Sequence, residues 1–287
     1  MSEFEAINAA IDKIDNITNN EWLEDLDDRK LKELEFHDRD RERMGSDNQV
    51  EKEAEGDTFE KFYGNKKYYK IIERSNAYVQ NWIATEAQGR VFLDYACGNG
   101  TNARLAAKSG ALISLGFDIS GVSVRNAIEF SKEENIENIR FFQADAENTQ
   151  LEDNSVDRII CSGMLHHLDL SFAIPELRRI LKPGGKILAV EALDYNPAIK
   201  LYRMLTPDMR TDWEKAHILS LKDVAFAKRF FKLGQINYWH VVGYAAGKFP
   251  SLARLLDLAD RFLEKIPYLQ RMSWMFTFEL IKEENKK

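Results

Sequence analysis

The sequence predicts an α/β protein whose central sheet is mostly parallel and flanked by helices. Between residues 91 and 191, short apolar runs alternate with helical patterns. Strands that alternate with helices are typical of βαβ units, which join parallel strands. The first of these strands also runs through glycines directly into a helix. This arrangement brings backbone N–H groups to one ligand site.

Residues 1–56 are predicted to be helical and heavily charged. Apolar side chains recur at helical spacing in two stretches, which Asn19 and Asn20 separate. One interpretation is a pair of helices that pack on the sheet or on a partner subunit. The other is a lid over a ligand site, because His37 and Asp38 place an imidazole beside a carboxylate.

Residues 59–86 are predicted to form a further helical region. Its density of aromatic residues exceeds what a surface helix requires, so most of these rings are expected in the core. We therefore separate an amino-terminal helical cap or lid, residues 1–86, from a main domain, residues 87–287.

The stretch 91–101 is the centre of the prediction. Strand-forming residues lead into Asp94 and a tight turn of small residues, and residues 101–109 are predicted as a helix that Gly110 ends. The amino end of that helix suits a polar or charged ligand.

Two further strands end in an acidic residue. Residues 112–118 end in Asp118, roughly 20 residues after the glycine turn, where a carboxylate accepts hydrogen bonds from ribose hydroxyls. Residues 139–145 end in Asp145. The spacing predicts a nucleotide-type pocket.

The strand signal then repeats twice. Residues 156–161 and 186–191 are predicted as strands four and five, with a helix over 175–181 and a turn at 182–185 between them. The segment 165–168, Leu-His-His-Leu, follows strand four.

Five motifs in this order carry a resemblance to a known family. They are the run 94–100 (D-Y-A-C-G-N-G), Asp118, the pair Ala144 and Asp145, the run 165–168 and the run 181–185 (L-K-P-G-G). Together they resemble class I S-adenosylmethionine-dependent methyltransferases, and most of all the small-molecule enzymes of ubiquinone and menaquinone biosynthesis. The resemblance covers roughly residues 85–195. It implies a Rossmann-like sheet of seven strands, mostly parallel with an antiparallel last strand.

The same resemblance implies S-adenosyl-L-methionine as the cofactor and assigns residues to it. Asp94 would position the turn and the ammonium end, Asp118 and Ile119 would hold ribose and adenine, and Asp145 would accept from the adenine amino group. The full set of implied cofactor-binding residues is Asp94, Ala96, Cys97, Gly98, Gly100, Asp118, Ile119, Asp145, Ala146 and Cys161. Family members often carry glycine at position 96, and alanine there predicts an ordinary backbone conformation.

His166 and His167 are the candidates for a general base. An imidazole that titrates near neutrality can take a proton from an acceptor hydroxyl. The alternative is that one of the two only hydrogen-bonds the loop.

The region after strand five is predicted to be variable. It contains a helical substrate region, residues 195–232, strand six at 236–241, a helical insertion at 242–271 and strand seven at 272–281. The insertion has a broad apolar face edged by basic residues. It is interpreted as a buried or dimer-forming helix, or alternatively as a wall for a lipid-like or isoprenoid substrate or a helix at a membrane surface. Three acidic residues weaken the membrane interpretation: Asp257, Asp260 and Glu264.

The net charge of −7 is unevenly distributed. Residues 1–60 carry 20 acidic and 8 basic residues, a net charge of −12, and the remaining 27 acidic and 32 basic residues give residues 61–287 a net charge of +5. Basic runs with interleaved aromatics are absent from the sequence, so no nucleic acid is expected as a partner.

Cys97 and Cys161 are expected as reduced thiols that line the pocket, at the ends of neighbouring strands one and four. Neither has metal-ligand spacing, so no metal is predicted. The absence of a signal sequence and of a long apolar run predicts a soluble, cytoplasmic protein.

These inferences predict a methyltransferase that acts on oxygen or carbon of a small molecule, such as a secondary metabolite, sugar, quinone or lipid precursor. The protein is also expected to be able to form a homodimer or to make peripheral contact with a membrane. The alternatives are a protein or RNA methyltransferase and a non-catalytic S-adenosylmethionine-binding protein.

Overall fold

The computed structural model describes residues 3–16, 26–44, 73–206 and 211–284. Its centre is one sheet with the strand order β3-β2-β1-β4-β5-β7-β6. Strands β1 to β5 are parallel, and β7 is antiparallel to both β5 and β6. The strands are β1 (Val91–Tyr95), β2 (Ile113–Asp118), β3 (Ile139–Gln143), β4 (Val156–Ser162), β5 (Leu181–Ala192), β6 (Lys232–Trp239) and β7 (Met275–Ile281). The predicted Rossmann-like sheet of seven strands is confirmed.

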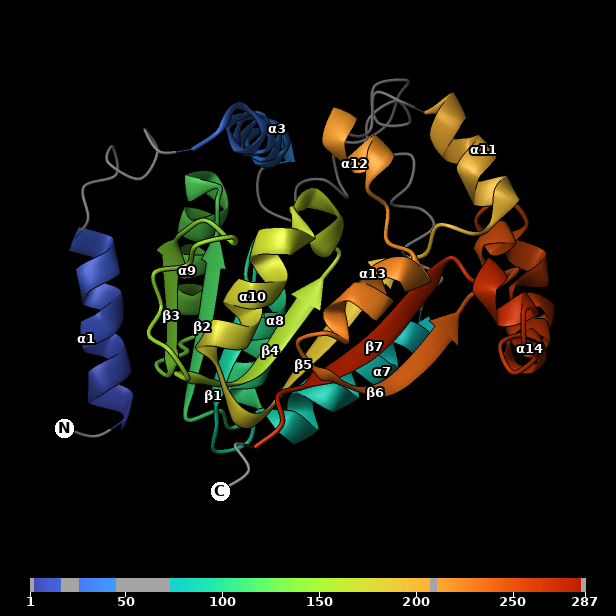
Figure 1. Ribbon diagram of the computed structural model, residues 1–287. Helices are drawn as coiled ribbons and strands as arrows, with labels where there is room; N and C mark the ends of the chain where they lie inside the picture. The colour runs from blue at the N-terminus through green and yellow to red at the C-terminus, as the bar shows by residue number, and fades with distance from the viewer. Residues whose placement is uncertain (1–2, 17–25, 45–72, 207–210, 285–287) are drawn as a thin grey trace.

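Helices cover both faces of the sheet (Figure 1). On one face lie α1 (Glu3–Asn16), α10 (Leu170–Ile180) and α13 (Leu221–Ala227), and on the other α7 (Glu73–Glu86), α8 (Thr101–Lys108) and α9 (Gly121–Glu133). Some of the predicted helical segments lie outside the described residues. They are residues 17–25 with Asn19 and Asn20, residues 45–72 with the first part of the region 59–86, and residues 207–210 of the predicted substrate region.

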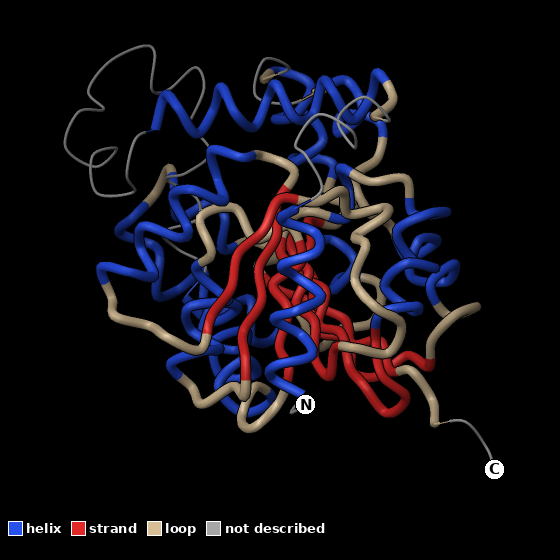
Figure 2. Tube along the Cα trace, turned by 90° about the vertical axis from the view of Figure 1, so that its left-hand side faces the viewer, coloured by secondary structure: helices blue, strands red, loops and turns tan. Residues whose placement is uncertain are grey.

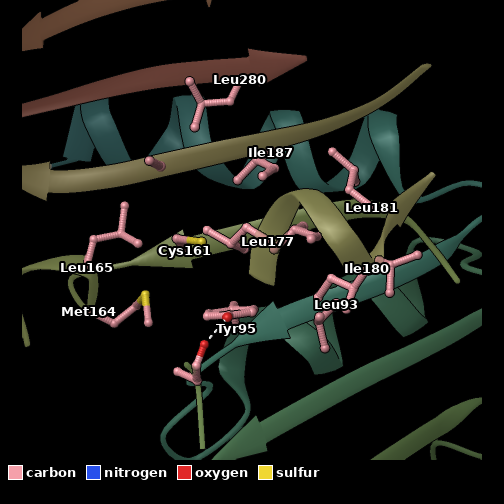
Figure 3. Packing of buried hydrophobic residues seen from close by; sticks show 14 of the residues in the cluster. Leu93, Tyr95, Cys161, Met164, Leu165, Leu177, Ile180, Leu181, Ile187 and Leu280 are labelled. Atoms are coloured by element: carbon pink, nitrogen blue, oxygen red, sulfur yellow. Dashed lines mark hydrogen bonds between the residues drawn. The ribbon is translucent and has the colours of Figure 1, made fainter. Parts of the chain in front are cut away.

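The core follows the alternation of side chains along each strand. Leu93 and Tyr95 of β1 pack against α10, where Leu177 and Ile180 are fully buried (Figure 3). Phe92, the residue before Leu93 on β1, points to the other face and packs with the α7 side of the core. Strands that are apolar on both faces are typical of parallel sheets buried between helix layers.

Several predicted elements have other bounds in the structure, among them the helix predicted over 175–181, which is α10 and starts at Leu170. The turn predicted at 182–185 is a bulge inside β5: Leu181 pairs with Val156 and Lys186 with Arg158, so extra residues of β5 loop out of the ladder. In the predicted helical substrate region, residues 195–232, the helix before strand six is only α13, because a capping box of Ser220 and Asp223 starts it at Leu221. The chain then enters β6 at Lys232, before the predicted start of strand six.

The remaining described elements are helix α3 and the elements that follow β5 in the chain. Helix α3 (Asp28–Met44) lies across the carboxyl ends of the strands, at the top of Figures 1 and 2. The elements beyond β5 are α11 (Pro197–Leu205), α12 (Asp212–Ala216), the 3₁₀ turns η3 (Gly243–Gly247) and η4 (Pro250–Leu252), α14 (Ala253–Leu263) and η5 (Leu269–Met272). Within the described ranges, none of the helices has both the length and the apolar character needed to cross a membrane.

Candidate active site

The turn after β1 is built from residues in left-handed backbone conformations. Ala96, Gly98 and Gly100 have φ angles of 55°, 50° and 74°. The expectation of an ordinary conformation at Ala96 is therefore wrong. Short hydrogen bonds hold this turn: Cys97 N–H donates to the Phe117 carbonyl over 2.7 Å, and Gly100 N–H donates to the Cys97 carbonyl over 2.9 Å. They offset a strain of roughly 1 kcal/mol for a left-handed alanine.

A cavity of about 270 Å³ opens above this turn, at the carboxyl ends of β1 to β4. We call it the first cavity. The predicted cofactor-binding residues that line it are Asp94, Ala96, Cys97, Gly98, Asp118, Ile119, Asp145 and Ala146. Four further lining residues come from α3 and were not predicted as site residues in a cofactor pocket: Arg29, Lys30, Glu33 and His37.

Asp118 ties the end of β2 to the glycine turn. Its Oδ2 accepts from Gly98 N–H over 2.8 Å, and its Oδ1 accepts from Ser120 N–H over 2.9 Å. Asp118 as a whole is 7% exposed, and it lines the first cavity. A carboxylate held in this way retains lone pairs that can accept from vicinal hydroxyls of a sugar.

Asp94 is the buried acid of the site. Burial raises the pKa of its carboxyl to about 7, although hydrogen bonds from the Ala103 N–H and the Asn102 side chain act in the opposite direction. A carboxylate in such an environment gains the most from a cationic group beside it. The position therefore suits the ammonium end of a ligand.

Asp145 and its neighbour Glu147 are bound by α3. Lys30 Nζ lies 2.6 Å from Asp145 Oδ2 and 3.0 Å from Glu147 Oε2, and Arg29 donates to Glu147 over 2.7 Å. Asp38 Oδ1 also accepts from the Ser120 hydroxyl over 2.5 Å. Helix α3 is thus attached by charge pairs to the same strand ends that carry the predicted cofactor residues.

Two predicted cofactor residues do not line the first cavity. Cys161 is fully buried in the hydrophobic core near Leu165 and Leu177 (Figure 3), and burial raises its pKa well above the usual value for a thiol. The side chain points to the helix α10 side because β4 residues alternate in direction. Gly100 starts α8 beneath Phe141, whose ring leaves no room for a Cβ. Cys161 is nevertheless next to Tyr95 of β1, so the predicted proximity of strands one and four is confirmed.

His167 faces the first cavity from a short 3₁₀ turn, η1 (Leu165–His167). Its Nδ1 lies 3.0 Å from Glu33 Oε2 of α3. Burial alone would raise the pKa of Glu33, but hydrogen bonds with His167 and Thr211 lower it below its usual value. Glu33 therefore connects α3 to η1 and to the start of α12.

His166 points the other way, toward a second cavity. Its Nδ1 lies 2.7 Å from Glu191 Oε2 at the end of β5, and Glu191 is 1% exposed. The other oxygen of Glu191 accepts from the N–H groups of Met164 and Leu165 over 2.9 and 2.7 Å. Because the carboxylate accepts at Nδ1, the Nε2 atom of a neutral His166 keeps its lone pair.

This second cavity has a volume of about 280 Å³ and lies between α11, α12 and η3. It is lined mostly by apolar and aromatic side chains. They are joined by His166, Arg203, Glu214 and Lys248 as polar groups. The centroids of the His166 and His167 rings lie 4.3 Å apart. These two imidazoles of η1 lie between the first and the second cavity.

Some of these residues also have donor atoms suited to a metal ion. Glu33, His37 and His167 bring a carboxylate oxygen and two imidazole nitrogens within 4.8 Å of one another, as do His166, His167 and Glu214. The sequence predicts no metal, and this stays a prediction.

Sequence reasoning missed three groups that shape the site: the α3 cations, Glu33 and Glu191. Glu191 had a local signal, since it is an acid at the end of a predicted strand like Asp94 and Asp118. The α3 residues had none, because their partners lie more than 100 residues away in the chain.

The fold and the first cavity together define a class: Rossmann-like α/β proteins with a nucleotide-type site at the carboxyl edge of the sheet. Within that class, residues 93–189 match the family described as methyltransferase domain. The predicted resemblance to class I S-adenosylmethionine-dependent methyltransferases is thereby confirmed.

Similar proteins carry methyltransferase names. An uncharacterized methyltransferase, YcgJ of Bacillus subtilis, is 37% identical over 106 residues, which are 37% of this chain and 41% of that protein. Demethylmenaquinone methyltransferase of Staphylococcus aureus is 31% identical over 122 residues, 41% of this chain and 48% of that enzyme. The chain spans less than half the length of these curated relatives.

Solved structures share the fold. The crystal structure of YcgJ superposes with a TM-score of 0.51 at 20% identity, covering 73% of this chain and all of that one. A putative sarcosine dimethylglycine methyltransferase from Galdieria sulphuraria gives a TM-score of 0.55 at 16% identity, with 74% and 88% of the two chains covered.

Proposed function

We propose that this protein transfers the methyl group of S-adenosyl-L-methionine to a small-molecule acceptor. The observation that carries the proposal is the convergence of Asp94, Gly98 and Asp118 on one cavity. These residues belong to the segment that matches the methyltransferase domain family.

The first cavity fits the chemical parts of the cofactor. Buried Asp94 matches a cationic amino-acid end, Asp118 matches ribose hydroxyls, and Asp145 with Ala146 provides a place for adenine. When bound, the cofactor supplies a methyl group activated by a sulfonium. The residues of this chain have to hold the two reactants in line, and such alignment can contribute several kcal/mol to catalysis.

The apolar part of the acceptor is proposed to lie in the second cavity, with His166 at its inner wall. Its reacting atom would extend past η1 to the cofactor in the first cavity, because in-line transfer requires contact between the two reactants. Glu191 fixes the His166 ring through Nδ1, which leaves Nε2 to take a proton from an acceptor hydroxyl or an acidic carbon. The groups methylated would thus be oxygen or activated carbon. The apolar lining and the named activity of the demethylmenaquinone relative support an acceptor with a large apolar part, such as a quinone or lipid precursor.

Helix α3 is proposed as a lid over the cofactor. Four of its side chains line the first cavity, and its charge pairs reach Asp145 and Glu147. The division into a cap, residues 1–86, and a main domain, together with a cytoplasmic location, stays a prediction.

Purified protein incubated with methyl-labelled S-adenosylmethionine and a metabolite extract tests the function. Label is expected in small organic-soluble molecules. Cofactor binding without any transfer would instead indicate a non-catalytic binder, and label confined to added protein or RNA would indicate a macromolecular acceptor.

A further inference from the structure

Exposed apolar side chains are concentrated at one end of the molecule. Among the described residues, twelve large hydrophobic side chains are exposed, and only Leu112 and Phe172 lie outside two short stretches. The other ten are Leu201, Met204 and Leu205 of α11, and Phe249, Leu252, Leu255, Leu258, Phe262, Tyr268 and Leu269 in and around α14. Both helices lie at the same end, beyond β6 (Figure 1). Single exposed apolar residues are ordinary, but such a concentration marks an interaction surface.

The exposed face of α14 is apolar with a basic edge. Leu255, Leu258 and Phe262 follow one another at helical spacing and are 63%, 65% and 68% exposed. The basic edge beside this face consists of Arg254, Arg261 and Lys265, which are also exposed. Cations beside an apolar helix face are typical of helices that lie in a membrane interface.

Two of the three acidic residues of this segment point away from that face. Asp260 is fully buried and accepts from the Val242 and Gly243 N–H groups over 2.8 and 3.0 Å. Glu264 accepts a bidentate pair of hydrogen bonds from Arg74 of α7.

The third acid, Asp257, is paired with Arg74 over 2.6 Å and with Arg261 over 3.0 Å. In the sequence these three acids weaken a membrane interpretation. In the fold Asp260 and Glu264 anchor α14 to the protein, whereas the side chain of Asp257 is 40% exposed and offsets the charge of Arg261. The positive charge of the edge therefore rests on Arg254 and Lys265.

The second cavity opens beside this face. Lys248 and Phe249 line the cavity and are also exposed, so they form its rim. Helix α11 borders the cavity on the other side through Ile199 and Tyr202. The Asn196 side chain, which caps α11, donates to the Met272 carbonyl over 2.6 Å and so ties α11 to η5.

We propose that α11, η4 and α14 dock on a membrane surface that contains anionic lipids. Leu201, Met204 and Leu205 of α11 would enter the interface beside the apolar face of α14, with the basic edge at the lipid headgroups. The mouth of the second cavity would then open next to the bilayer. The proposal that a lipid-dissolved acceptor enters through that mouth rests on the proposed function. The proposal that the protein docks on the membrane does not.

A second copy of the chain fits this face less well. In a two-fold dimer the same patch faces itself, which would bring the cations of Arg254, Arg261 and Lys265 near their own copies. Such a dimer would also cover Phe249 and the mouth of the cavity. An anionic bilayer meets the same face with opposite charge.

Sedimentation of the full chain with vesicles tests the docking. Vesicles of phosphatidylcholine with about one third phosphatidylglycerol should bind the protein, vesicles of phosphatidylcholine alone should bind it much less, and added salt should weaken binding. Two double variants are each expected to bind the anionic vesicles at least roughly tenfold more weakly. One combines Arg254→Glu with Lys265→Glu, and the other combines Leu258→Ser with Phe262→Ser.

Phe172→Ser is the matched control. Phe172 is 61% exposed, close to the 68% of Phe262, but lies on α10 away from the proposed face. It should bind vesicles like the unaltered chain. Calorimetric binding of S-adenosylhomocysteine should be unchanged in all variants, which shows that they are folded.

Three results would overturn the docking proposal. The first is equal binding of the protein to both vesicle types. The second is vesicle binding that is unchanged in both double variants. The third is a protein that binds no vesicles and forms a dimer in sedimentation velocity, which Phe262→Ser dissociates. Vesicle binding without methyl transfer to any added small molecule would keep the docking and reject the proposed function.

Discussion

Asp94 is an acidic residue of the first cavity whose pKa lies near neutral pH. Burial raises its pKa in the fold to about 7, above the ordinary value of 3.8. Between these values the folded protein holds a proton that the unfolded chain has released, so the stability that this group contributes is lost as pH rises toward 7. Burial favours the protonated form of Asp94. A ligand with an ammonium group favours the ionised carboxylate instead.

We therefore expect S-adenosylhomocysteine to bind more tightly as pH rises from 6 to 8, with proton release at the lower pH. Calorimetry in buffers of different ionisation enthalpy measures both quantities. Asp94→Asn should bind more weakly and lose most of the pH dependence. The same pH slope in Asp94→Asn would show that another group is responsible.

Asp118 gives a second prediction at this scale. Asp118→Ala removes the proposed ribose acceptor and leaves the N–H groups of Gly98 and Ser120 without this partner. Affinity for S-adenosylhomocysteine should fall at least tenfold, which corresponds to about 1.4 kcal/mol. Glu129→Ala, an exposed substitution on α9, should bind normally. Normal calorimetric affinity in Asp118→Ala would refute the ribose assignment.

His166 is predicted to act in turnover and not in cofactor binding. His166→Ala should lower kcat by roughly 10²- to 10⁴-fold, the usual contribution of a general base, with unchanged affinity for S-adenosylhomocysteine. Glu191→Gln should lower kcat less, because the amide can still hold the ring but no longer fixes the same tautomer. An unaltered rate in His166→Ala, measured with the labelled cofactor, would leave only a structural role for this residue.

At the scale of elements, α3 is the part whose role is most directly testable. Replacing Arg29 and Lys30 with Met removes the cations that reach Asp145 and Glu147. If α3 is a lid, S-adenosylhomocysteine should dissociate several-fold faster in stopped-flow measurements, since partly buried charge pairs hold the closed position.

Lys32→Met is the control for that experiment, because Lys32 is on the same helix and is exposed. It should leave the dissociation rate unchanged. If the double substitution also has no effect, α3 serves only to pack against the site.

The elements also show where sequence reasoning succeeds and fails. The ends of β1 and β2 could be placed because local patterns define them: an apolar run, an acid and a glycine turn. The bulge in β5 could not, because it depends on pairing Leu181 with Val156 of another strand. In the same way, Asp118 was found from its spacing, whereas Glu33 acquires its role through contacts with His167 and Thr211.

For the whole molecule, the sheet of seven strands with an antiparallel last strand was predicted by resemblance and not by composition. What the sequence could not provide was the direction of side chains on the variable helices. Asp257, Asp260 and Glu264 count against a membrane surface in the sequence, but the fold turns them toward Arg74 and the backbone of η3. The proposed docking face and the two cavities on either side of η1 exist only in the folded chain.

The position of β7 has a consequence for how the protein is made. β7 follows β6 in the chain but lies between β5 and β6 in the sheet. During synthesis on the ribosome, β6 therefore has no place in the sheet until residues 275–281 have emerged. Until then the nascent chain carries β5 as an unpaired edge, a form open to mispairing with other chains, and β7 is the strand that closes it.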